Sequence, residues 1–321
     1  MTQKLVSIIV PAYNEEAVLD IFHARISEVL ATLPDYAWEI LFINDGSTDA
    51  TQLKIEALQR HDPRVGGILL SRNFGKEIAM TAGLDHAKGD AVVIIDADLQ
   101  DPPELIHDFL REWNKGYDVV YGRRTHRDGE SWAKKATAHY FYRVIGKLSK
   151  VSIPANTGDF RLMSRRSVDA LLKLREQHRF MKGLFAWVGY PTTAVDYRRP
   201  PRAAGVTKFN YWKLWNFALE GITSFTILPL KLATYLGIFV AMLAFLAGLV
   251  VITNTLLWGE PVAGYPTLIV TILFLGGVQL FFIGVLGEYL GRIYNETKIR
   301  PLYVVQEFAA PQPASTNPTP P

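Results

Sequence analysis

Short apolar runs alternate with amphipathic stretches along the N-terminal two thirds of the chain. The run over 5–10 ends at proline, the runs over 38–43, 65–70 and 91–95 end at polar residues, and a further run covers 118–121. Runs of this length predict buried strands, and the stretches between them predict helices. Because strands and helices alternate, we expect βαβ units in a doubly wound, mostly parallel α/β sheet, with the strand-end loops on one rim.

Two far longer apolar stretches follow toward the C-terminus. Residues 232–257 and 261–287 contain no charged side chain. An apolar helix needs about 20 residues to cross a bilayer, and each stretch is longer than that. We therefore predict a hairpin of two transmembrane helices, at about 232–257 and 263–287. Lysine and arginine flank the outer ends of this hairpin. The positive-inside rule then places both ends in the cytosol and predicts a multi-pass protein of the plasma (inner) membrane.

The segment before the hairpin, 209–228, places aromatic residues on one face at helical spacing. This pattern favours an amphipathic helix at the membrane interface over a buried core helix. The predicted organisation is therefore a cytosolic α/β domain over 1–208, the amphipathic helix, the hairpin within 229–291 and a cytosolic C-terminal segment over 292–321. From Ala309 onward that segment is rich in Pro, Ala, Ser and Thr, so we expect its end to be disordered.

Composition excludes several classes of function. The 321 residues include no cysteine, so disulfides, thiolate metal sites and a thiol nucleophile are excluded. The formal net charge of only +3 argues against a nucleic-acid-binding protein. The apolar run near the N-terminus is too short for a signal peptide, which agrees with a cytosolic α/β domain.

Two carboxylates follow the buried run 91–95. Asp96 and Asp98 come at the edge of the sheet where open α/β folds bind their ligands. Residues i and i+2 of a strand point to the same side, so the two carboxylates are expected to converge on a cation. Oxygen ligands suit Mg²⁺ or Mn²⁺, which bind substrate phosphates at the same time. A carboxylate pair that only forms a turn and a helix cap is the alternative.

The other strand-end loops carry further polar side chains, namely Tyr13, Asn14, Glu15, Asp45, Lys76 and Arg123. A rim of acids with a few basic groups suits a nucleotide diphosphate and its metal. The patterns G-x-G-x-x-G and G-x-x-x-x-G-K-[ST] are both absent, which excludes the two commonest nucleotide-binding loops and leaves a carboxylate–metal mode. Asn14 is also expected to cap the helix that follows it.

Several of these segments resemble the family-2 glycosyltransferases with the GT-A fold, namely 10–15, 44–49, 96–98 and 157–161. Segments 71–76 and 96–103 resemble more narrowly the polyprenyl-phosphate glycosyltransferases, which include dolichyl-phosphate mannose synthase and the bacterial GtrB-type glucosyltransferases. The resemblance extends over about the whole chain, and several motifs in order are more specific than one. It implies a nucleotide-sugar donor, a divalent cation and inversion at the anomeric carbon.

The resemblance also implies roles for individual residues. Binding of the donor nucleotide is carried over to Pro11, Tyr13, Asn14, Glu15, Asp45, Lys76 and Asp96. Binding of the metal is carried over to Asp98, Asp96 and Gln100. Because cations recognise a phosphate dianion, binding of the acceptor phosphate is assigned to Arg123, Arg124, Arg202 and Lys208. The alternative readings are a turn residue for Asp45 and a solvated charge for Lys76.

Asp159 matches the catalytic aspartate of the family, and Arg161 follows it in the same motif. The acceptor phosphate has its second pKa near about 6, so it is mostly dianionic at neutral pH and needs little deprotonation. We therefore expect Asp159 either to take the residual proton or to position the phosphate, with Arg161 holding the phosphate in place. The sequence is compatible with both roles.

The predicted function is that of a membrane-anchored inverting glycosyltransferase, which moves one sugar from a nucleotide donor to polyprenyl (undecaprenyl) phosphate at the cytosolic leaflet for modification of a cell-envelope glycan. Glucose from UDP-glucose is favoured, and GDP-mannose or an aminoarabinose nucleotide stays open. The alternatives are a processive polysaccharide synthase, whose Q-x-x-R-W motif the string 177–180 does not match, and a non-catalytic sugar-nucleotide sensor or scaffold. Expected partners are membrane lipid, a second copy of the chain through the membrane helices, and a flippase of the same pathway.

Overall fold

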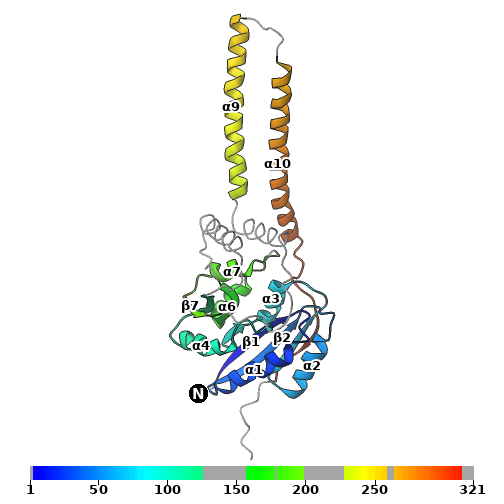
Figure 1. The fold of residues 1–321 in the computed structure, drawn as a ribbon, viewed down its shortest axis with the longest axis vertical. Coiled ribbons are helices and arrows are strands. Elements are labelled where there is room, and N and C mark those ends of the chain that lie inside the picture. The colour runs from blue at the N-terminus through cyan, green and yellow to red at the C-terminus, as the bar shows by residue number, and fades with distance from the viewer. Residues whose placement is uncertain (1–2, 126–156, 178, 199–227, 259–263, 313–321) are drawn as a thin grey trace, which may run out of the picture. The chain divides into compact units, whose positions relative to one another are not determined.

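The computed structural model describes residues 3–125, 157–177, 179–198, 228–258 and 264–312. The chain divides into two compact units, Met1–Asn216 with Pro301–Pro321, and Phe217–Arg300. The first unit is an α/β domain, and the second contains two long helices (Figure 1).

An eight-stranded sheet forms the centre of the first unit, in the order β7-β5-β6-β4-β1-β2-β3-β8. Its strands are β1 Lys4–Ala12, β2 Tyr36–Asn44, β3 Val65–Leu70, β4 Ala91–Ile94, β5 Val119–Arg124, β6 Thr157–Ser164, β7 Thr192–Tyr197 and β8 Val305–Ala309. Neighbouring strands are parallel, except that β6 is antiparallel to β4 and β5, and β8 is antiparallel to β3. The predicted α/β class with a mostly parallel sheet is confirmed. The five predicted strands correspond to β1 to β5, which all run in the same direction, so their loops leave the sheet at one rim as expected. The strands β6 and β8 were not among them and run in the opposite direction.

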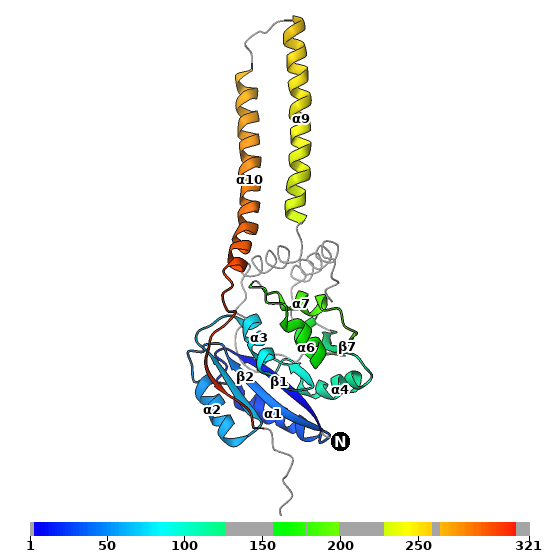
Figure 2. The same cartoon turned by 180° about the vertical axis from the view of Figure 1, so that it is seen from behind.

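Helices cover both faces of the sheet (Figures 1 and 2). They are α1 Leu19–Ala31, α2 Thr51–His61, α3 Lys76–His86, α4 Ile106–Asn114, α6 Arg165–Leu172 and α7 Met181–Trp187, with a 3₁₀ turn η1 at Pro103–Leu105. Along β1, Ile8 belongs to the same apolar cluster as Phe22 of α1, whereas the adjacent Ile9 lies against Gly83 of α3. An added Cβ at Gly83 would lie 2.5 Å from Cγ2 of Ile9, so glycine permits the close approach of α3. Alternate residues of β1 thus pack against opposite helix layers, which explains its nearly continuous apolar run.

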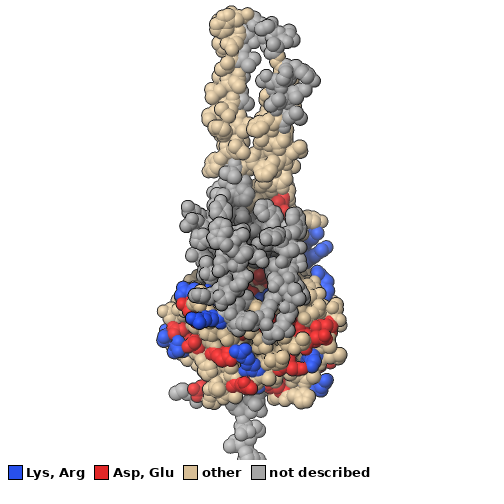
Figure 3. All heavy atoms as spheres, viewed as in Figure 1, with Lys and Arg blue, Asp and Glu red and all other residues tan. Residues whose placement is uncertain are grey.

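The second unit consists of α9 Leu228–Trp258 and α10 Tyr265–Thr297, which lie side by side in both views (Figures 1 and 2). Their described apolar side chains are largely exposed, and Figure 3 shows few charged atoms along them. Among the described residues, one stretch is long and apolar enough to cross a membrane, Phe274–Thr297, with a mean hydropathy of 1.5. A shorter apolar stretch lies in α9 at Ala233–Ala247. These stretches overlap the two predicted spans, and the number of spans stays a prediction.

The C-terminal segment contributes an edge strand to the sheet of the first unit. The strand β8 pairs with β3. Two backbone hydrogen bonds flank this pairing: the N–H of Ser71 donates to the carbonyl oxygen of Val304 at 3.0 Å, and the N–H of Gln312 donates to the carbonyl oxygen of Pro63 at 2.7 Å. The expected disorder from Ala309 onward is therefore wrong as far as Gln312, and the residues beyond it lie outside the described part. Composition did not predict this strand, because its pairing partner β3 is distant in sequence and sheet edges recruit strands through backbone groups rather than apolar side chains.

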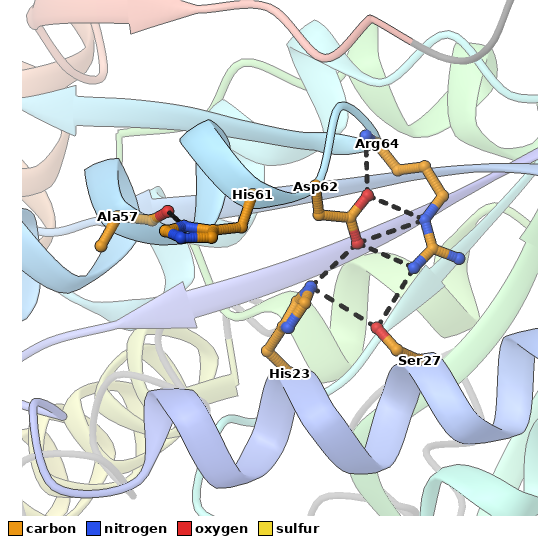
Figure 4. A network of polar contacts seen from close by, with 6 residues as sticks. All are labelled: His23, Ser27, Ala57, His61, Asp62 and Arg64. Atoms are coloured by element: carbon orange, nitrogen blue, oxygen red, sulfur yellow. Dashed lines mark hydrogen bonds and ion pairs between the residues drawn. The ribbon is translucent and has the colours of Figure 1, made fainter.

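A network of polar contacts fastens α1 to the connection between α2 and β3 (Figure 4). The carboxylate of Asp62 accepts hydrogen bonds from Nη2 and Nε of Arg64 at 2.7 and 2.9 Å, and lies 2.9 Å from Nε2 of His23. Arg64 also donates to Oγ of Ser27 at 3.2 Å. Burial of Asp62 opposes its ionisation, but the hydrogen bonds from Arg64 and His23 outweigh burial and lower its pKa to about 2. Ionised Asp62 therefore stabilises this corner of the fold.

Candidate active site

The reversal of β6 brings its first residues beside the carboxyl ends of β4 and β5. Ile94, the last residue of β4, pairs with Arg161, and the end of β5 pairs with the start of β6 in the same way. Asp159 lies two residues before Arg161 along β6, so it reaches the edge of the sheet from which the loop with Asp96 emerges. Carboxylates from two distant parts of the sequence thereby meet at one place.

Lys76, the first residue of α3, connects these two carboxylates. Its Nζ lies 2.7 Å from Oδ1 of Asp96 and 2.6 Å from Oδ2 of Asp159. Partial desolvation of the ammonium opposes its protonation, but the negative charges of Asp159 and Asp96 outweigh this effect and raise the pKa of Lys76 above its usual range. The lysine is therefore a cation at neutral pH, and it neutralises one of the two carboxylates.

Asp159 combines an ionised carboxylate with an unused acceptor. Its side chain is only 13% exposed, and within the described part of the chain its Oδ1 is a buried oxygen with no hydrogen-bond partner. Burial favours the neutral acid, but the positive charges of Lys76 and Lys182 outweigh burial and hold the pKa of Asp159 well below its usual range. A carboxylate with so low a pKa is a weak base, so it is better suited to orient a substrate group than to remove a proton from it.

Arg161 places a second fixed positive charge next to Asp159. Its guanidinium donates to the carbonyl oxygens of Asp159 and Gly158, at 3.2 and 2.9 Å, and stacks on the ring of Phe185 in α7 with Cζ 3.6 Å from the ring centre. The side chain is buried, and burial lowers the pKa of Arg161 to about 10. Arg161, Phe185 and Lys182 line one cavity of about 210 Å³. This side of the site is therefore cationic and partly aromatic.

Two ionisable residues of the site were not predicted from the sequence, Glu77 and Lys182. Burial and the charge of Asp159 raise the pKa of Glu77 to about 8, although the charges of Lys76 and Lys182 oppose the rise. Oε2 of Glu77 accepts a hydrogen bond from the N–H of Met181 at 3.2 Å. No local motif marks either residue, because α3 and α7 meet only in the folded chain. The one sequence signal is that Glu77 adjoins Lys76.

The loop after β1 is fastened to the loop after β2. Asn14 has a φ of 55°, its side-chain oxygen accepts a hydrogen bond from the N–H of Thr48 at 2.9 Å, and its own N–H donates to Oγ of Ser47 at 3.0 Å. The expectation that Asn14 caps the next helix is wrong, because α1 begins only at Leu19 and has no side-chain cap. Instead, Asn14 adopts a left-handed conformation that asparagine tolerates and uses its amide to join the two loops.

Three further residues with a predicted donor role lie at this end of β1, namely Pro11, Tyr13 and Glu15. Pro11 is half-buried and is the second-last residue of the strand, and Tyr13 is 39% exposed. The N–H of Glu15 donates to Oγ1 of Thr51 at 2.9 Å. These contacts hold the loop in place, and binding of the donor by its side chains stays a prediction.

Asp45, directly after β2, organises the loop that leads to Lys76. Its Oδ1 accepts a hydrogen bond from the N–H of Phe74 at 2.7 Å, and its Oδ2 accepts one from the N–H of Gly75 at 2.9 Å. Burial raises the pKa of Asp45, and these two hydrogen bonds oppose the rise. Asp45 therefore holds the start of α3, and its predicted contact with the donor nucleotide stays a prediction.

The residues predicted to hold the metal lie in a turn rather than in a strand. β4 ends at Ile94, so the rule that residues i and i+2 of a strand share a side does not apply to Asp96 and Asp98. Oδ1 of Asp98 accepts a hydrogen bond from the N–H of Gln100 at 3.1 Å, and Gln100 is only 8% exposed. In the described ranges, no group of three or more His, Cys, Asp or Glu side chains is arranged to hold a metal ion.

Two of the four arginines and lysines predicted to bind the acceptor phosphate are described, and both have partners in the protein. Arg123 pairs with Asp196 of β7 through two contacts at 2.6 and 2.9 Å. Nε of Arg124 donates to the hydroxyl of Tyr197 at 3.1 Å, and its Nη2 lies 3.7 Å from Oδ1 of Asp101. Both guanidinium groups thus tie β5 to its neighbours. Outside the described residues lie Arg202, Lys208 and the predicted amphipathic helix as far as residue 227.

The fold is that of an α/β glycosyltransferase with the GT-A arrangement. The chain belongs to glycosyl transferase family 2, whose sequence profile matches residues 7–172. Residues 228–293 match the GtrB C-terminal hairpin, so the predicted GtrB-type resemblance is confirmed. This hairpin match and the apolar stretch in α10 associate the chain with a membrane.

Relatives cover nearly the whole chain. It is 52% identical over 301 residues to the bactoprenol glucosyl transferase of Shigella phage SfV, and the aligned region covers 94% of this chain and 98% of that protein. It is 50% identical over 301 residues to a prophage bactoprenol glucosyl transferase homolog of Escherichia coli (strain K12), with the same coverage. It is 54% identical over 302 residues to an uncharacterized glycosyltransferase of Synechocystis sp., which covers 94% of this chain and 95% of that protein.

Proposed function

We propose that the chain transfers glucose from UDP-glucose to polyprenyl phosphate, with inversion at the anomeric carbon, at the cytosolic face of the plasma membrane. The observation that carries the proposal is the cluster of Lys76, Asp96 and Asp159, in which one ammonium separates the ionised Asp159 from the turn after β4. The substrate pair is suggested by the relatives whose names include bactoprenol glucosyl transferase. The hairpin supports it, because the acceptor stays in the bilayer and an anchored enzyme meets it at the surface.

In this reaction an oxygen of the acceptor phosphate forms a bond to the anomeric carbon, and the bond from that carbon to the diphosphate breaks. UDP leaves with the electron pair of the broken bond. The acceptor is mostly dianionic above its second pKa of about 6, so removal of a proton is a minor demand. The low pKa of Asp159 favours a positioning role. Its Oδ1 would accept a hydrogen bond from a substrate hydroxyl, or from the acceptor phosphate while that still carries its residual proton. Arg161 and Lys182 would offset the charge of the incoming phosphate.

The residues in the turn after β4 fit a divalent cation by their chemistry. Asp96 and Asp98 supply carboxylate oxygens, which are the ligands that Mg²⁺ and Mn²⁺ prefer, and the side chain of Asp96 is 20% exposed. These two residues would hold the ion, and Gln100 would adjoin them. When bound, the ion neutralises charge that develops on a leaving diphosphate. In this proposal, Asp96 and Asp98 orient the diphosphate, and Asp159 faces the acceptor.

Turnover of labelled nucleotide sugars by the full-length chain tests this function. Purified chain in detergent should transfer label from UDP-glucose to undecaprenyl phosphate, so that the label becomes extractable into butanol, and chelator should abolish the transfer. Asp98→Asn keeps the acceptor oxygen of the turn but weakens the metal site, so it should lose at least about 100-fold in rate while its melting temperature stays unchanged. Transfer from GDP-mannose or an aminoarabinose nucleotide instead would reject glucose, and full activity in chelator would reject the metal.

The absence of cysteine makes the orientation in the membrane directly measurable, because each introduced thiol is the only one in the chain. In intact cells, a membrane-impermeant maleimide should label Gly264→Cys, between the two helices, and should label Thr48→Cys only after the membrane is opened. Labelling of Thr48→Cys in intact cells would reject a cytosolic active site. Association of copies through the membrane helices and a flippase partner belong to the same proposal, and crosslinking of Gly264→Cys between copies tests the first.

A further inference from the structure

Lys76 shares one positive charge between two carboxylates that serve different halves of the proposed reaction. Its Nζ contacts both oxygens of Asp96, at 2.7 and 2.8 Å, and Oδ2 of Asp159 at 2.6 Å. Asp96 lies on the side proposed for the donor, and Asp159 on the side proposed for the acceptor. The side chain of Lys76 is 43% exposed, so ligands that enter from solution can reach the ammonium.

A divalent cation and this ammonium compete for the same carboxylate. Both oxygens of Asp96 already face Nζ, and two positive groups a few ångströms apart repel each other even in water. We therefore expect an ion that binds Asp96 to displace Lys76 from it. The released ammonium remains next to Asp159 and has lost one of its two anionic partners. The diphosphate of the donor is the anion that arrives together with the metal, and lysine is a common ligand of phosphate oxygens.

We propose that Lys76 is an exchangeable counter-ion, which neutralises Asp96 while the donor site is empty and transfers to the donor diphosphate when a divalent cation takes its place. The proposal rests on the proposed function, from which it takes the donor side of the site. Its first consequence is that Lys76 weakens binding of the metal alone. Its second is that the metal and the nucleotide bind cooperatively, and by linkage each raises the affinity for the other by the same factor.

The exchange also serves the acceptor side. Asp159 keeps Lys76 as a partner before and after the donor binds, so its carboxylate stays ionised throughout. Asp45 holds the loop that leads to Lys76, because its carboxylate accepts hydrogen bonds from the N–H groups of Phe74 and Gly75. The backbone at the start of α3 therefore remains in place, and the lysine moves by its flexible side chain. Lys76 is thus a positioning residue that couples occupancy of the donor site to the charge around Asp159.

The experiment measures binding rather than turnover. Mn²⁺ is titrated into the full-length chain in detergent, alone and with saturating UDP, and free Mn²⁺ is followed by electron paramagnetic resonance. In Lys76→Met, Mn²⁺ alone should bind at least about 10-fold more tightly than in the wild type, because a competing and repelling charge is gone. The factor by which UDP raises the affinity for Mn²⁺ should fall by about 10-fold in the same variant. Lys76→Arg, which keeps the charge, should stay close to the wild type.

Two controls assign the effect to this exchange. Lys54 forms an ion pair with Asp20 of α1 outside the candidate site, so Lys54→Met should leave both quantities unchanged. Adding Asp96→Asn to Lys76→Met should remove the gain in Mn²⁺ affinity, because the gain requires the carboxylate that the lysine releases. A lysine that only supports the fold would not make the metal bind more tightly when it is removed.

Unchanged or weaker binding of Mn²⁺ by Lys76→Met overturns the proposal. If that variant does not fold, the wild type decides, because absence of positive coupling between Mn²⁺ and UDP overturns the proposal equally. Neither readout depends on the sugar or on the acceptor. A chain that shows the coupling yet does not glucosylate polyprenyl phosphate therefore contradicts the proposed function, and one that glucosylates it without the coupling contradicts this inference.

Discussion

The carboxyl group of Glu77 accepts a hydrogen bond from the N–H of Met181 at 3.2 Å, and this bond joins the start of α3 to the start of α7. Burial and the nearby charge of Asp159 raise the pKa of Glu77 to about 8. At pH 7 the carboxyl group is therefore mostly protonated, and it joins the two helices without adding a second negative charge next to Asp159. An acid with this pKa makes stability depend on pH.

We predict that the wild type becomes less stable as the pH rises from about 4.5 through 8. The folded state binds the proton of Glu77 more tightly than the unfolded state, so the stability that the neutral acid contributes is complete below the unfolded pKa and is lost as the pH passes the folded one. Glu77→Gln should remove this loss and melt about 2–4 °C above the wild type at pH 9. Melting temperatures between pH 5 and 9 measure it. Identical pH profiles for the two proteins would contradict it.

Asp159→Asn should lose at least about 100-fold in turnover at pH 7, with little change in UDP binding. Lys76 and Lys182 keep Asp159 ionised across the neutral range. The defect should shrink as the pH rises past about 6, because the acceptor then has no residual proton for Asp159 to take. Rates of the two proteins from pH 5 to 9 decide the matter. A constant defect at every pH would restrict Asp159 to orienting the acceptor, and lost UDP binding would move it to the donor side.

Asp62→Asn should cost about 2 kcal/mol of folding free energy at pH 7, because the variant loses the charged partner of Arg64 and His23. The lowered pKa means that this contribution is present above the unfolded pKa of about 4 and is lost as the pH falls through about 2. Denaturant unfolding at pH 7 measures the loss, and unfolding at progressively lower pH should bring the two proteins together. Asp20→Asn, at an exposed pair with Lys54, is the control and should cost less than about 1 kcal/mol.

A stop after Arg300 should destabilise the α/β unit by at least about 2 kcal/mol, whereas a stop after Gln312 should not. The shorter chain loses β8, the hydrogen bond of the Tyr303 hydroxyl to Asp85 at 2.7 Å and the contact of Phe308 with the ring of His86. It should also bind UDP more weakly, because Ser71 at the start of the loop to Lys76 loses its backbone partner. Melting temperature and UDP titration of both truncations test this. Equal stability would mean that β8 is dispensable.

The hydrophobic pattern was sufficient to predict the α/β class and most strands of the sheet. A strand that is apolar on both faces is shielded from water only when other elements cover both faces of its sheet. The runs 5–10 and 91–95 therefore predicted central strands. The motif spacings likewise indicated the family before any contact was known. These features are local, because each depends on residues within one element or one loop.

The hydrophobic pattern did not predict that β6 runs antiparallel to its neighbours. This direction brings Asp159 to the same edge of the sheet as Asp96. Strand direction depends on pairing across the whole sheet, and the apolar pattern of a strand is the same in both directions. The same holds for β8, whose partner β3 lies far away in the sequence. The ion pair of Lys76 with both carboxylates, and the high pKa of Glu77 next to α7, arise from burial and from charges that long-range folding brings together. The chemistry was thus encoded in single residues, while the electrostatics that would tune it required the assembled fold.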